Sequence, residues 1–207
     1  AVDCGRYPIK RVVGEEVVVQ AILFADGHDA LAARVLYRHA AAGSWSEAVM
    51  RHVEHDRRQG TFTVEEVGIY SYTVTGWIDR FTTWQKGIKN KSDAGQNVAV
   101  DLLVGREMLI EAAKRASGDD RKKLSEYGEQ LKEVNIRDAV TLVLREELTE
   151  LMGRYADINH ATRYDKELTV TVERKQALFS TWYERFPRSC AREEGRHGTF
   201  RDCELIL

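Results

Sequence analysis

The sequence has no long apolar run, no marked excess of one charge and little cysteine. No stretch approaches the roughly 20 apolar residues that a helix needs to cross a bilayer, and the first residues lack the basic-then-apolar pattern of a secretory signal. Lysine and arginine number 31 against 33 aspartates and glutamates, which gives a net charge of -2. We therefore expect a cytoplasmic protein with no membrane partner and, because no basic excess is available for phosphates, no nucleic-acid partner.

The three cysteines, Cys4, Cys190 and Cys203, are an odd number and too few for a disulfide framework. No Cys-x-x-Cys pair is present, which excludes a zinc ribbon and a thioredoxin-like site. An unpaired cysteine in a strand or helix usually serves as a small buried hydrophobic residue, and we expect that role here.

Motifs of common catalytic and phosphate-binding sites are also missing. There is no glycine-rich phosphate loop, Ser-x-x-Lys, Gly-x-Ser-x-Gly or His-Glu-x-x-His. His52 and His55 could hold a metal, but the stretch is typical of a strand end and turn and offers no evident third ligand. Asp26, His28 and Asp29 could act as acid and base, yet they favour a turn bonded to its own backbone. We expect no catalytic residue and no metal site.

Short alternating segments dominate the first part of the chain. In residues 16–24, Val17 and Val19 fall on one side and Glu16 and Gln20 on the other, as in a half-buried strand. Similar segments are expected at residues 35–37, 45–53, 62–64 and 69–79. Short strands at this close spacing favour two antiparallel sheets packed face to face, an immunoglobulin-like β-sandwich.

The periodicity then changes from that of strands to that of helices. Residues 83–155 lack proline, and we expect helices near 84–94, 100–116, 119–133 and 136–155. In the helix expected near 100–116, the core-facing residues should be Val100, Leu103, Val104, Met108, Ile110 and Ala112. In the helix expected near 136–155, they should be Val140, Leu144, Leu148 and Leu151. Residues 168–173 alternate again as a strand that rejoins the sheets, so the two ends of the helical bundle must lie close together.

The last part of the chain predicts a strand over residues 179–188 and a helix that begins after Thr199 as its N-cap. A strand, a loop and a helix make half of a βα unit whose partner strands are absent. The whole is thus an α+β chain of several domains: sandwich (1–83), inserted helical bundle (84–156), return strand of the sandwich (157–180) and truncated start of a (β/α)8 barrel (181–207).

Several motifs in this order resemble a known family. W-Y-E-x-F-P-R-S followed by G-T-F-R-D, at residues 182–202, resembles the entry into the (β/α)8 barrel of the alpha-amylase superfamily, glycoside hydrolase family thirteen. More narrowly, the chain resembles the N-terminal region of the bacterial alpha-1,4-glucan:maltose-1-phosphate maltosyltransferases. The motifs that carry this resemblance are GRYPIKR at 5–11, FADGHD at 24–29, WSE at 45–47, G-x-Y-x-Y-x-V-x-x-W-x-D-R-F-x-x-W at 68–84 and HATRY at 160–164.

The resemblance implies a retaining transfer of maltosyl units from alpha-maltose 1-phosphate to alpha-1,4-glucan, without a metal or nucleotide cofactor. Such a transfer needs two carboxyl groups roughly 5 Å apart, and the resemblance implies that both come from barrel strands beyond Leu207. This chain alone would then be inactive, and would support the barrel and form part of a homodimer through the helical insertion. Ordinary packing within one chain is the competing explanation for the apolar helix faces.

Two alternatives stay open: the N-terminal region of an amylase-like hydrolase, and a free-standing glucan-binding module. Sugar rings stack on flat aromatic side chains, and Trp45, near a strand start after Gly43 and Ser44, is the best-placed candidate to be exposed. Trp77, Trp84 and Trp182 are further candidates, although burial in a core is the better interpretation of Trp77. Arg188 could reach the rim of a sugar site, or could simply pair with a nearby carboxylate.

Overall fold

The computed structural model describes residues 2–181 and 184–206. They form eight strands, six α-helices and three short 3-10 helices. The strands are β1 (Ile9–Val12), β2 (Glu16–Ile22), β3 (Leu31–His39), β4 (Ser46–Glu54), β5 (Arg57–Thr63), β6 (Gly68–Ile78), β7 (Thr162–Arg163) and β8 (Leu168–Glu173). The α-helices are α1 (Arg80–Asp93), α2 (Ala99–Arg115), α3 (Gly118–Glu133), α4 (Ile136–Val143), α5 (Glu146–Arg154) and α6 (Phe200–Glu204). The 3-10 helices are η1 (Asp3–Gly5), η2 (Lys175–Leu178) and η3 (Pro187–Cys190).

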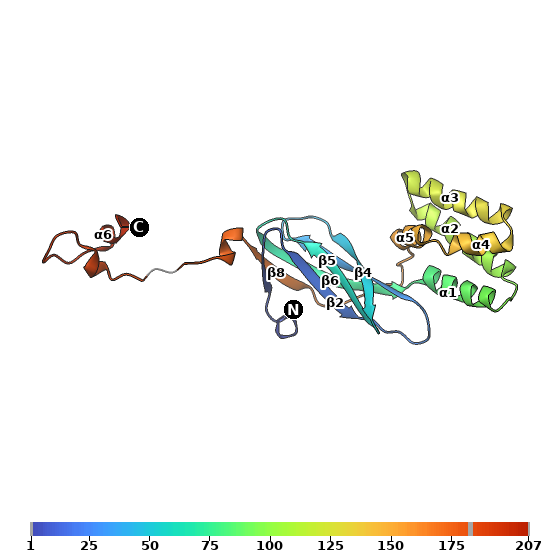
Figure 1. The fold of residues 1–207 in the computed structure, drawn as a ribbon, viewed down its shortest axis with the longest axis horizontal. Coiled ribbons are helices and arrows are strands. Elements are labelled where there is room, and N and C mark those ends of the chain that lie inside the picture. The colour runs from blue at the N-terminus through green and yellow to red at the C-terminus, as the bar shows by residue number, and fades with distance from the viewer. Residues whose placement is uncertain (1, 182–183, 207) are drawn as a thin grey trace.

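The molecule is elongated, with the strands in the middle (Figure 1). Helices α1 to α5 gather at one end, and the segment that carries α6 extends from the other end. No helix within residues 2–181 and 184–206 combines the length and the apolar character needed to span a membrane.

The strands follow the order β1-β8-β6-β3-β4-β5-β2, with β7 paired to β6 beside this path. Strand β4 bonds β3 through its first half, Ser46–Met50, and β5 through its second half, with an irregularity between His52 and Glu54. Strands that change partner in this way let a sheet turn a corner. The sheet therefore folds over, and its distant members face each other.

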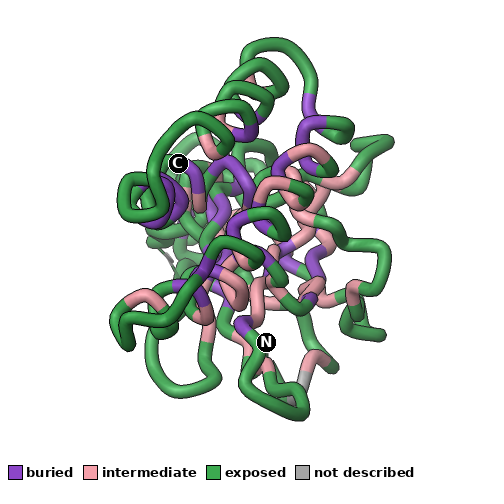
Figure 2. The backbone as a smooth tube through the Cα atoms, turned by 90° about the vertical axis from the view of Figure 1, so that its right-hand side faces the viewer, coloured by how far each residue is buried: buried purple, intermediate pink, exposed green. Residues whose placement is uncertain are grey.

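One core lies between the two halves of this folded sheet. Val17 and Val19 of β2 share it with Val170 and Val172 of β8, although these strands lie near opposite ends of the strand order. Phe62 of β5 stacks on Tyr37 of β3 with ring centroids 4.3 Å apart, which joins these two strands through the same core. Figure 2 shows the buried segments gathered inside and the exposed loops around them.

Most of the expected strands are present, but their pairing differs from the prediction. β1 was not expected, and it pairs with β8 in parallel, whereas the other strand pairs among the described residues are antiparallel. Two antiparallel sheets packed face to face were expected; the described strands form one continuous hydrogen-bonded path that is bent upon itself, and β1 with β8 is a parallel pair within it.

The helices leave the sheet after β6 and return to the same strand. β7 pairs Arg163 with Thr75 and Thr162 with Gly76, and β8 continues along the first half of β6. The expectation that the two ends of the helical insertion lie close together is confirmed. α1 begins at Arg80, slightly earlier than the predicted boundary at residue 84.

Two apolar clusters stabilise the helices. The first is built on Leu109, Leu124, Leu148 and their neighbours, and the second on Ile88, Val98 and Val143, while Trp84 and Leu131 pack against both. The single helix expected over 136–155 is in fact α4 and α5, because Arg145 has an extended backbone (φ -65°, ψ 136°). Leu144, expected in the core, is consequently 37% exposed.

The predicted core face of α2 is also partly wrong. The residues that α2 buries are Leu102, Gly105, Leu109, Ala112 and Ala113. Small residues on this face let neighbouring helices approach closely. Three of the larger apolar residues, Val100, Leu103 and Val104, point outward instead, with exposures of 74%, 66% and 47%.

The C-terminal segment confirms the helix but not the strand. α6 begins after Thr199, whose backbone N–H and hydroxyl both donate to the Asp202 carboxylate, at 2.7 and 2.8 Å. The expected strand over 179–188 does not form in residues 179–181 or 184–188, and η3 occupies its end. Trp182 and Tyr183 lie outside the described residues. A strand requires a neighbouring strand to satisfy its backbone groups.

Candidate functional site between the sheet and the helices

The passage from sheet to helices is fixed by hydrogen bonds around Asp79. Its carboxylate caps α1 by accepting from the Thr82 N–H at 2.9 Å and the Thr82 hydroxyl at 2.7 Å. The Asp79 N–H donates to the carbonyl of Ala30 at 2.7 Å, and the Ala30 N–H donates to the Thr83 hydroxyl at 2.8 Å. The first turn of α1 is therefore attached to the chain that enters β3.

Arg34 of β3 makes the second connection. Its side chain is only 15% exposed, and its guanidinium lies 5.2 Å from the centroid of the Trp77 ring. One nitrogen donates to the Glu47 carboxylate at 2.6 Å. Another donates to the carbonyls of Gly153 at 2.6 Å and Arg154 at 3.2 Å, at the C-terminal end of α5. A cation is favourable at this end of a helix, so Arg34 links three strands to the last helix of the insertion.

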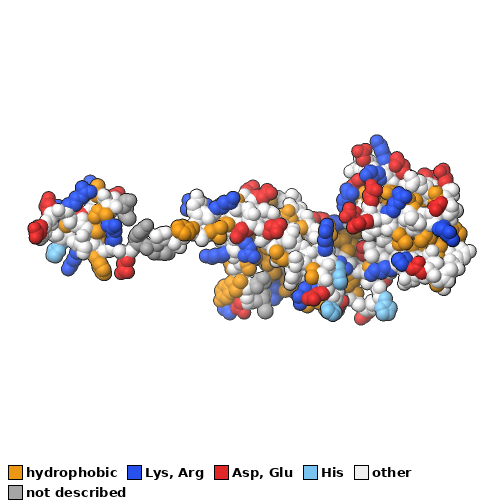
Figure 3. All heavy atoms as spheres, viewed as in Figure 1, with side chains coloured by type: hydrophobic (Ala, Val, Ile, Leu, Met, Phe, Trp, Pro, Cys, Tyr) orange, Lys and Arg blue, Asp and Glu red, His pale blue; other side chains and the backbone are white. Residues whose placement is uncertain are grey.

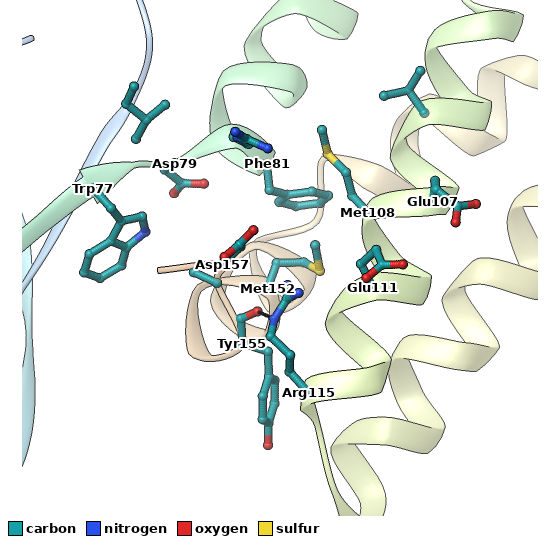
Figure 4. Close-up of a pocket in the computed structure, with 14 residues that line it drawn as sticks. Trp77, Asp79, Phe81, Glu107, Met108, Glu111, Arg115, Met152, Tyr155 and Asp157 are labelled. Atoms are coloured by element: carbon teal, nitrogen blue, oxygen red, sulfur yellow. Dashed lines mark hydrogen bonds between the residues drawn. The ribbon is translucent and has the colours of Figure 1, made fainter. Parts of the chain in front are cut away.

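A cleft of about 300 Å³ lies between these connections (Figure 4). Its apolar surface comes from Trp77 of β6, Phe81 of α1 and the methionines of α2 and α5, Met108 and Met152. Its charged residues are Asp79, Arg80, Glu107, Glu111, Arg115 and Asp157. The indole Nε1 of Trp77 is buried and has no hydrogen-bond partner among the described residues. The cleft thus combines an apolar floor with charges of both signs.

One wall of the cleft is held by a network around Asp120. Both the Tyr155 hydroxyl and Arg154 donate to one Asp120 oxygen at 2.9 Å, and Arg115 donates to the Tyr155 carbonyl at 2.9 Å. The hydrogen bond to Asp120 raises the pKa of Tyr155 above 10.0, and desolvation and the Asp120 charge act in the same direction. The network joins α2, α3 and the end of α5.

The exposed apolar residues of α2 begin at this cleft. Val104 lines it, while Leu103 and Val100 continue the apolar surface toward the start of the helix. Elsewhere on the helices, basic and acidic side chains are interspersed (Figure 3). We refer to Val100, Leu103 and Val104 as the α2 surface. A contiguous apolar patch of this kind is typical of a protein contact.

A second groove, of about 630 Å³, brings two of the sequence motifs together. Phe24 and Ala25 of the FADGHD motif line it, together with His160, Thr162 and Tyr164 of the HATRY motif. Phe24 is 84% exposed and Tyr164 is 48% exposed. The residues lie far apart in the sequence and meet because β7 returns beside β6.

The two predicted sugar-contacting residues lie in different parts of the molecule. Trp45 precedes β4, is half-buried, and has the guanidiniums of Arg38 and Arg163 at 4.3 and 4.7 Å from its ring centroid. An arriving sugar would have to displace these groups. Arg188 is exposed in η3, in the segment that extends away from the sheet (Figure 1). The structure does not bring the two residues together.

The other candidates from the sequence have local roles. The ring of His52 lies 2.6 Å from the carbonyl of His55, within one turn. Over residues 2–181 and 184–206, no group of three or more His, Cys, Asp or Glu is placed to hold a metal ion. Trp77 is buried, at 8% exposure, as the sequence favoured. Trp84 packs between the two helical clusters and donates to the Asp101 carbonyl at 2.9 Å.

Residues 1–174 match the family model described as "Alpha-1,4-glucan:maltose-1-phosphate maltosyltransferase, domain N/S". The chain belongs to the alpha-1,4-glucan:maltose-1-phosphate maltosyltransferase family. The resemblance seen in the sequence motifs is thereby confirmed.

Relatives bearing this name are similar over essentially the whole chain. The maltosyltransferase of Chlorobaculum tepidum is 43% identical over 206 residues, which cover 100% of this chain and 31% of the relative. That of Myxococcus xanthus is 40% identical over 210 residues, which cover 98% of this chain and 32% of the relative. That of Methylacidiphilum infernorum is 34% identical over 209 residues, which cover 100% of this chain and 31% of the relative. The chain thus spans about a third of the length of the curated relatives it matches.

Within this maltosyltransferase region, sequence reasoning missed Arg34. Its partners Gly153 and Arg154 lie 119 and 120 residues away, so no local pattern could identify them. The alternation of β3 gives one signal, because it places Arg34 on the face opposite the buried Ala33 and Val35. A largely buried arginine on that face implies that another part of the chain covers it.

Proposed function

We propose that this chain is the non-catalytic N-terminal region of a retaining glycosyltransferase that moves maltosyl units from alpha-maltose 1-phosphate to alpha-1,4-glucan. The observation that supports this best is the match of residues 1–174 to the N/S domain of the maltosyltransferase family. The names of the relatives favour a transferase over a hydrolase. In this proposal the protein is cytoplasmic, uses no cofactor, and has its reacting carboxyl groups in the catalytic part of the enzyme.

The proposed architecture is an immunoglobulin-like sandwich interrupted by a helical bundle and followed by the start of a catalytic barrel. The core shared by β2 and β8 supports the sandwich, and the pairing of β7 with β6 supports the insertion. The sequence-based boundaries were 1–83, 84–156, 157–180 and 181–207; we propose to keep them except the first, so that the helical part starts at Arg80 and the first part of the sandwich ends at Asp79.

A phosphate-release assay tests the absence of catalysis. The 207-residue chain, incubated with alpha-maltose 1-phosphate and an alpha-1,4-glucan, should release no phosphate above a protein-free blank. A longer protein that carries this sequence together with a catalytic part like that of the relatives should release phosphate and lengthen the glucan. Release by the short chain would overturn the proposal, and free maltose as the product of the longer protein would favour the hydrolase.

Two surfaces support a structural role. The groove that joins Phe24 to Tyr164 is apolar and open, and we propose that it receives the catalytic part, so that this region supports the barrel. The α2 surface, in turn, would pack against a second copy and form a homodimer. Exposed valine and leucine side chains lose their contact with water in such an interface, which favours association.

A weaker proposal concerns sugar binding at Trp45 and Arg188. If Trp45 stacks on a glucan, Trp45→Ala should weaken the affinity of the chain for maltoheptaose, measured by calorimetry. The guanidiniums over the ring argue against strong binding. No detectable heat with the unaltered chain would end this proposal.

A further inference from the structure

The segment after residue 184 folds into a small unit of its own. α6 packs against η3, and the Gly198 N–H donates to the Arg188 carbonyl at 3.1 Å. A side chain at Gly198 would collide with the backbone of Pro187 and Ala191, so this close approach requires glycine. Arg192, just after η3, donates to the carbonyl of Leu205, just after α6, at 3.5 Å. The loop between η3 and α6 is therefore closed by contacts at both of its ends.

This closure places the second and third cysteines of the chain next to each other. Cys190 is the last residue of η3 and is 6% exposed, while Cys203 lies in α6 and is half-buried. Both are free thiols. The neighbouring Cys190 thiol, followed by burial, raises the pKa of Cys203. Cys190 also contacts the Phe186 carbonyl, at 3.6 Å. Cys190 is thus buried, as expected of an unpaired cysteine, and the packing of α6 on η3 brings Cys203 to it.

We propose that Cys190 and Cys203 form a redox-modification site, in which a small disulfide such as oxidised glutathione converts the two thiols into an intramolecular disulfide. Cys203 is the more accessible of the two and reacts first, at a rate that rises with pH because its raised pKa leaves only a small thiolate fraction near neutral pH. Its thiolate attacks one sulfur of the glutathione disulfide, which forms a mixed disulfide and expels one glutathione thiolate. Cys190, after losing its proton, then attacks the Cys203 sulfur and expels the second glutathione thiolate.

The overall reaction is balanced. Two cysteine thiols and one oxidised glutathione give one protein disulfide and two reduced glutathiones, so the protein loses two electrons and two protons. The new bond joins η3 to α6 and closes the loop that contains the charged residues Arg192, Glu193, Glu194 and Arg196. A disulfide lowers the conformational entropy of the unfolded chain more than that of the folded chain. The packing of α6 on η3 should therefore be more stable in the oxidised chain than in the reduced chain.

The test is titration of the 207-residue chain with glutathione redox buffers, followed by acid quenching and maleimide labelling. The fully reduced chain should label at three cysteines and the oxidised chain at one, with the protein mass lowered by two hydrogen atoms. Peptide mapping should find Cys190 linked to Cys203. In urea, the equilibrium constant for forming this disulfide should fall by about tenfold or more, because the folded segment holds the thiols together.

Matched variants separate the site from general cysteine reactivity. Cys4→Ser should leave the Cys190–Cys203 disulfide and its equilibrium constant unchanged. Cys190→Ser and Cys203→Ser should each abolish it and leave only a mixed disulfide with glutathione. The proposal is overturned if the unaltered chain yields mixed disulfides alone, if Cys4 is the main partner, or if the equilibrium constant is the same with and without urea.

Discussion

Single residues connect the two parts of this protein, and Arg34 is the clearest case. It contacts a tryptophan ring, a carboxylate and two helix carbonyls, all from a largely buried position. The sequence could predict that Val17, Val19 and Trp77 would be buried, because alternation and size determine this locally. It could not predict the role of Arg34, because that role depends on residues more than a hundred positions away.

Arg34→Ala should lower the free energy of unfolding by about 2 kcal/mol, because it leaves Glu47 and the α5 carbonyls without their donor. Arg51→Ala, at an exposed position of β4, is the matched control and should change it by less than about 0.5 kcal/mol. Urea unfolding followed by circular dichroism measures both variants. Equal stability of the two would show that Arg34 does not stabilise the junction.

Gly105 of α2 is the second critical residue. An alanine side chain there would collide with the ring of Trp84, which is held by its own bond to Asp101. Gly105→Ala should therefore destabilise the chain by about 1–3 kcal/mol. Gly87→Ala, in α1, meets nothing within 4 Å and should be neutral or stabilise by up to about 1 kcal/mol. The midpoint of urea unfolding measures the stability of each variant. A Gly105→Ala chain as stable as the unaltered chain would contradict the close packing of Trp84 on Gly105.

At the scale of elements, strands and helices with one solvent-exposed face and one buried face were predictable. β2 and β8 alternate clearly, and α3 has the expected spacing. The break between α4 and α5 was not predictable, because the residue that breaks the helix is Arg145 and not glycine or proline. The outward face of α2 was misassigned because valines and leucines of a surface have the same spacing as those of a core.

The network that joins α3 to the end of α5 makes a pH-dependent prediction. The pKa of Tyr155 is raised because its O–H donates to Asp120, so this stabilisation is present below the ordinary value of 10.0 and is lost as the pH rises through the raised value. The stability difference between the unaltered chain and Tyr155→Phe should be constant up to about pH 9 and shrink above about pH 10.

Urea unfolding at a series of pH values measures this difference. Tyr164→Phe, at a tyrosine that is 48% exposed, is the matched control for loss of a phenol hydroxyl. A difference between the unaltered chain and Tyr155→Phe that grows with pH would mean that the bond to Asp120 does not stabilise the junction.

At the scale of the whole molecule, the motifs predicted the family, whereas the arrangement of the surfaces came only from the structure. The FADGHD and HATRY motifs gave no indication that they line one groove. The strand expected over 179–188 shows what local sequence preference cannot predict. Its aromatic residues favour a strand, but a strand forms only where another can pair with it. Local preference alone therefore did not decide this segment.

The proposed homodimer is the central claim about what this region does. Sedimentation equilibrium of the 207-residue chain over a range of concentrations measures it most directly. We expect a reversible dimer of twice the 23.6 kDa chain mass, and a monomer for the variant in which Val100, Leu103 and Val104 are all changed to serine. These residues are exposed, so the variant should keep the circular dichroism of the unaltered chain. A monomer at every concentration, or a dimer that the variant leaves intact, would contradict the claim.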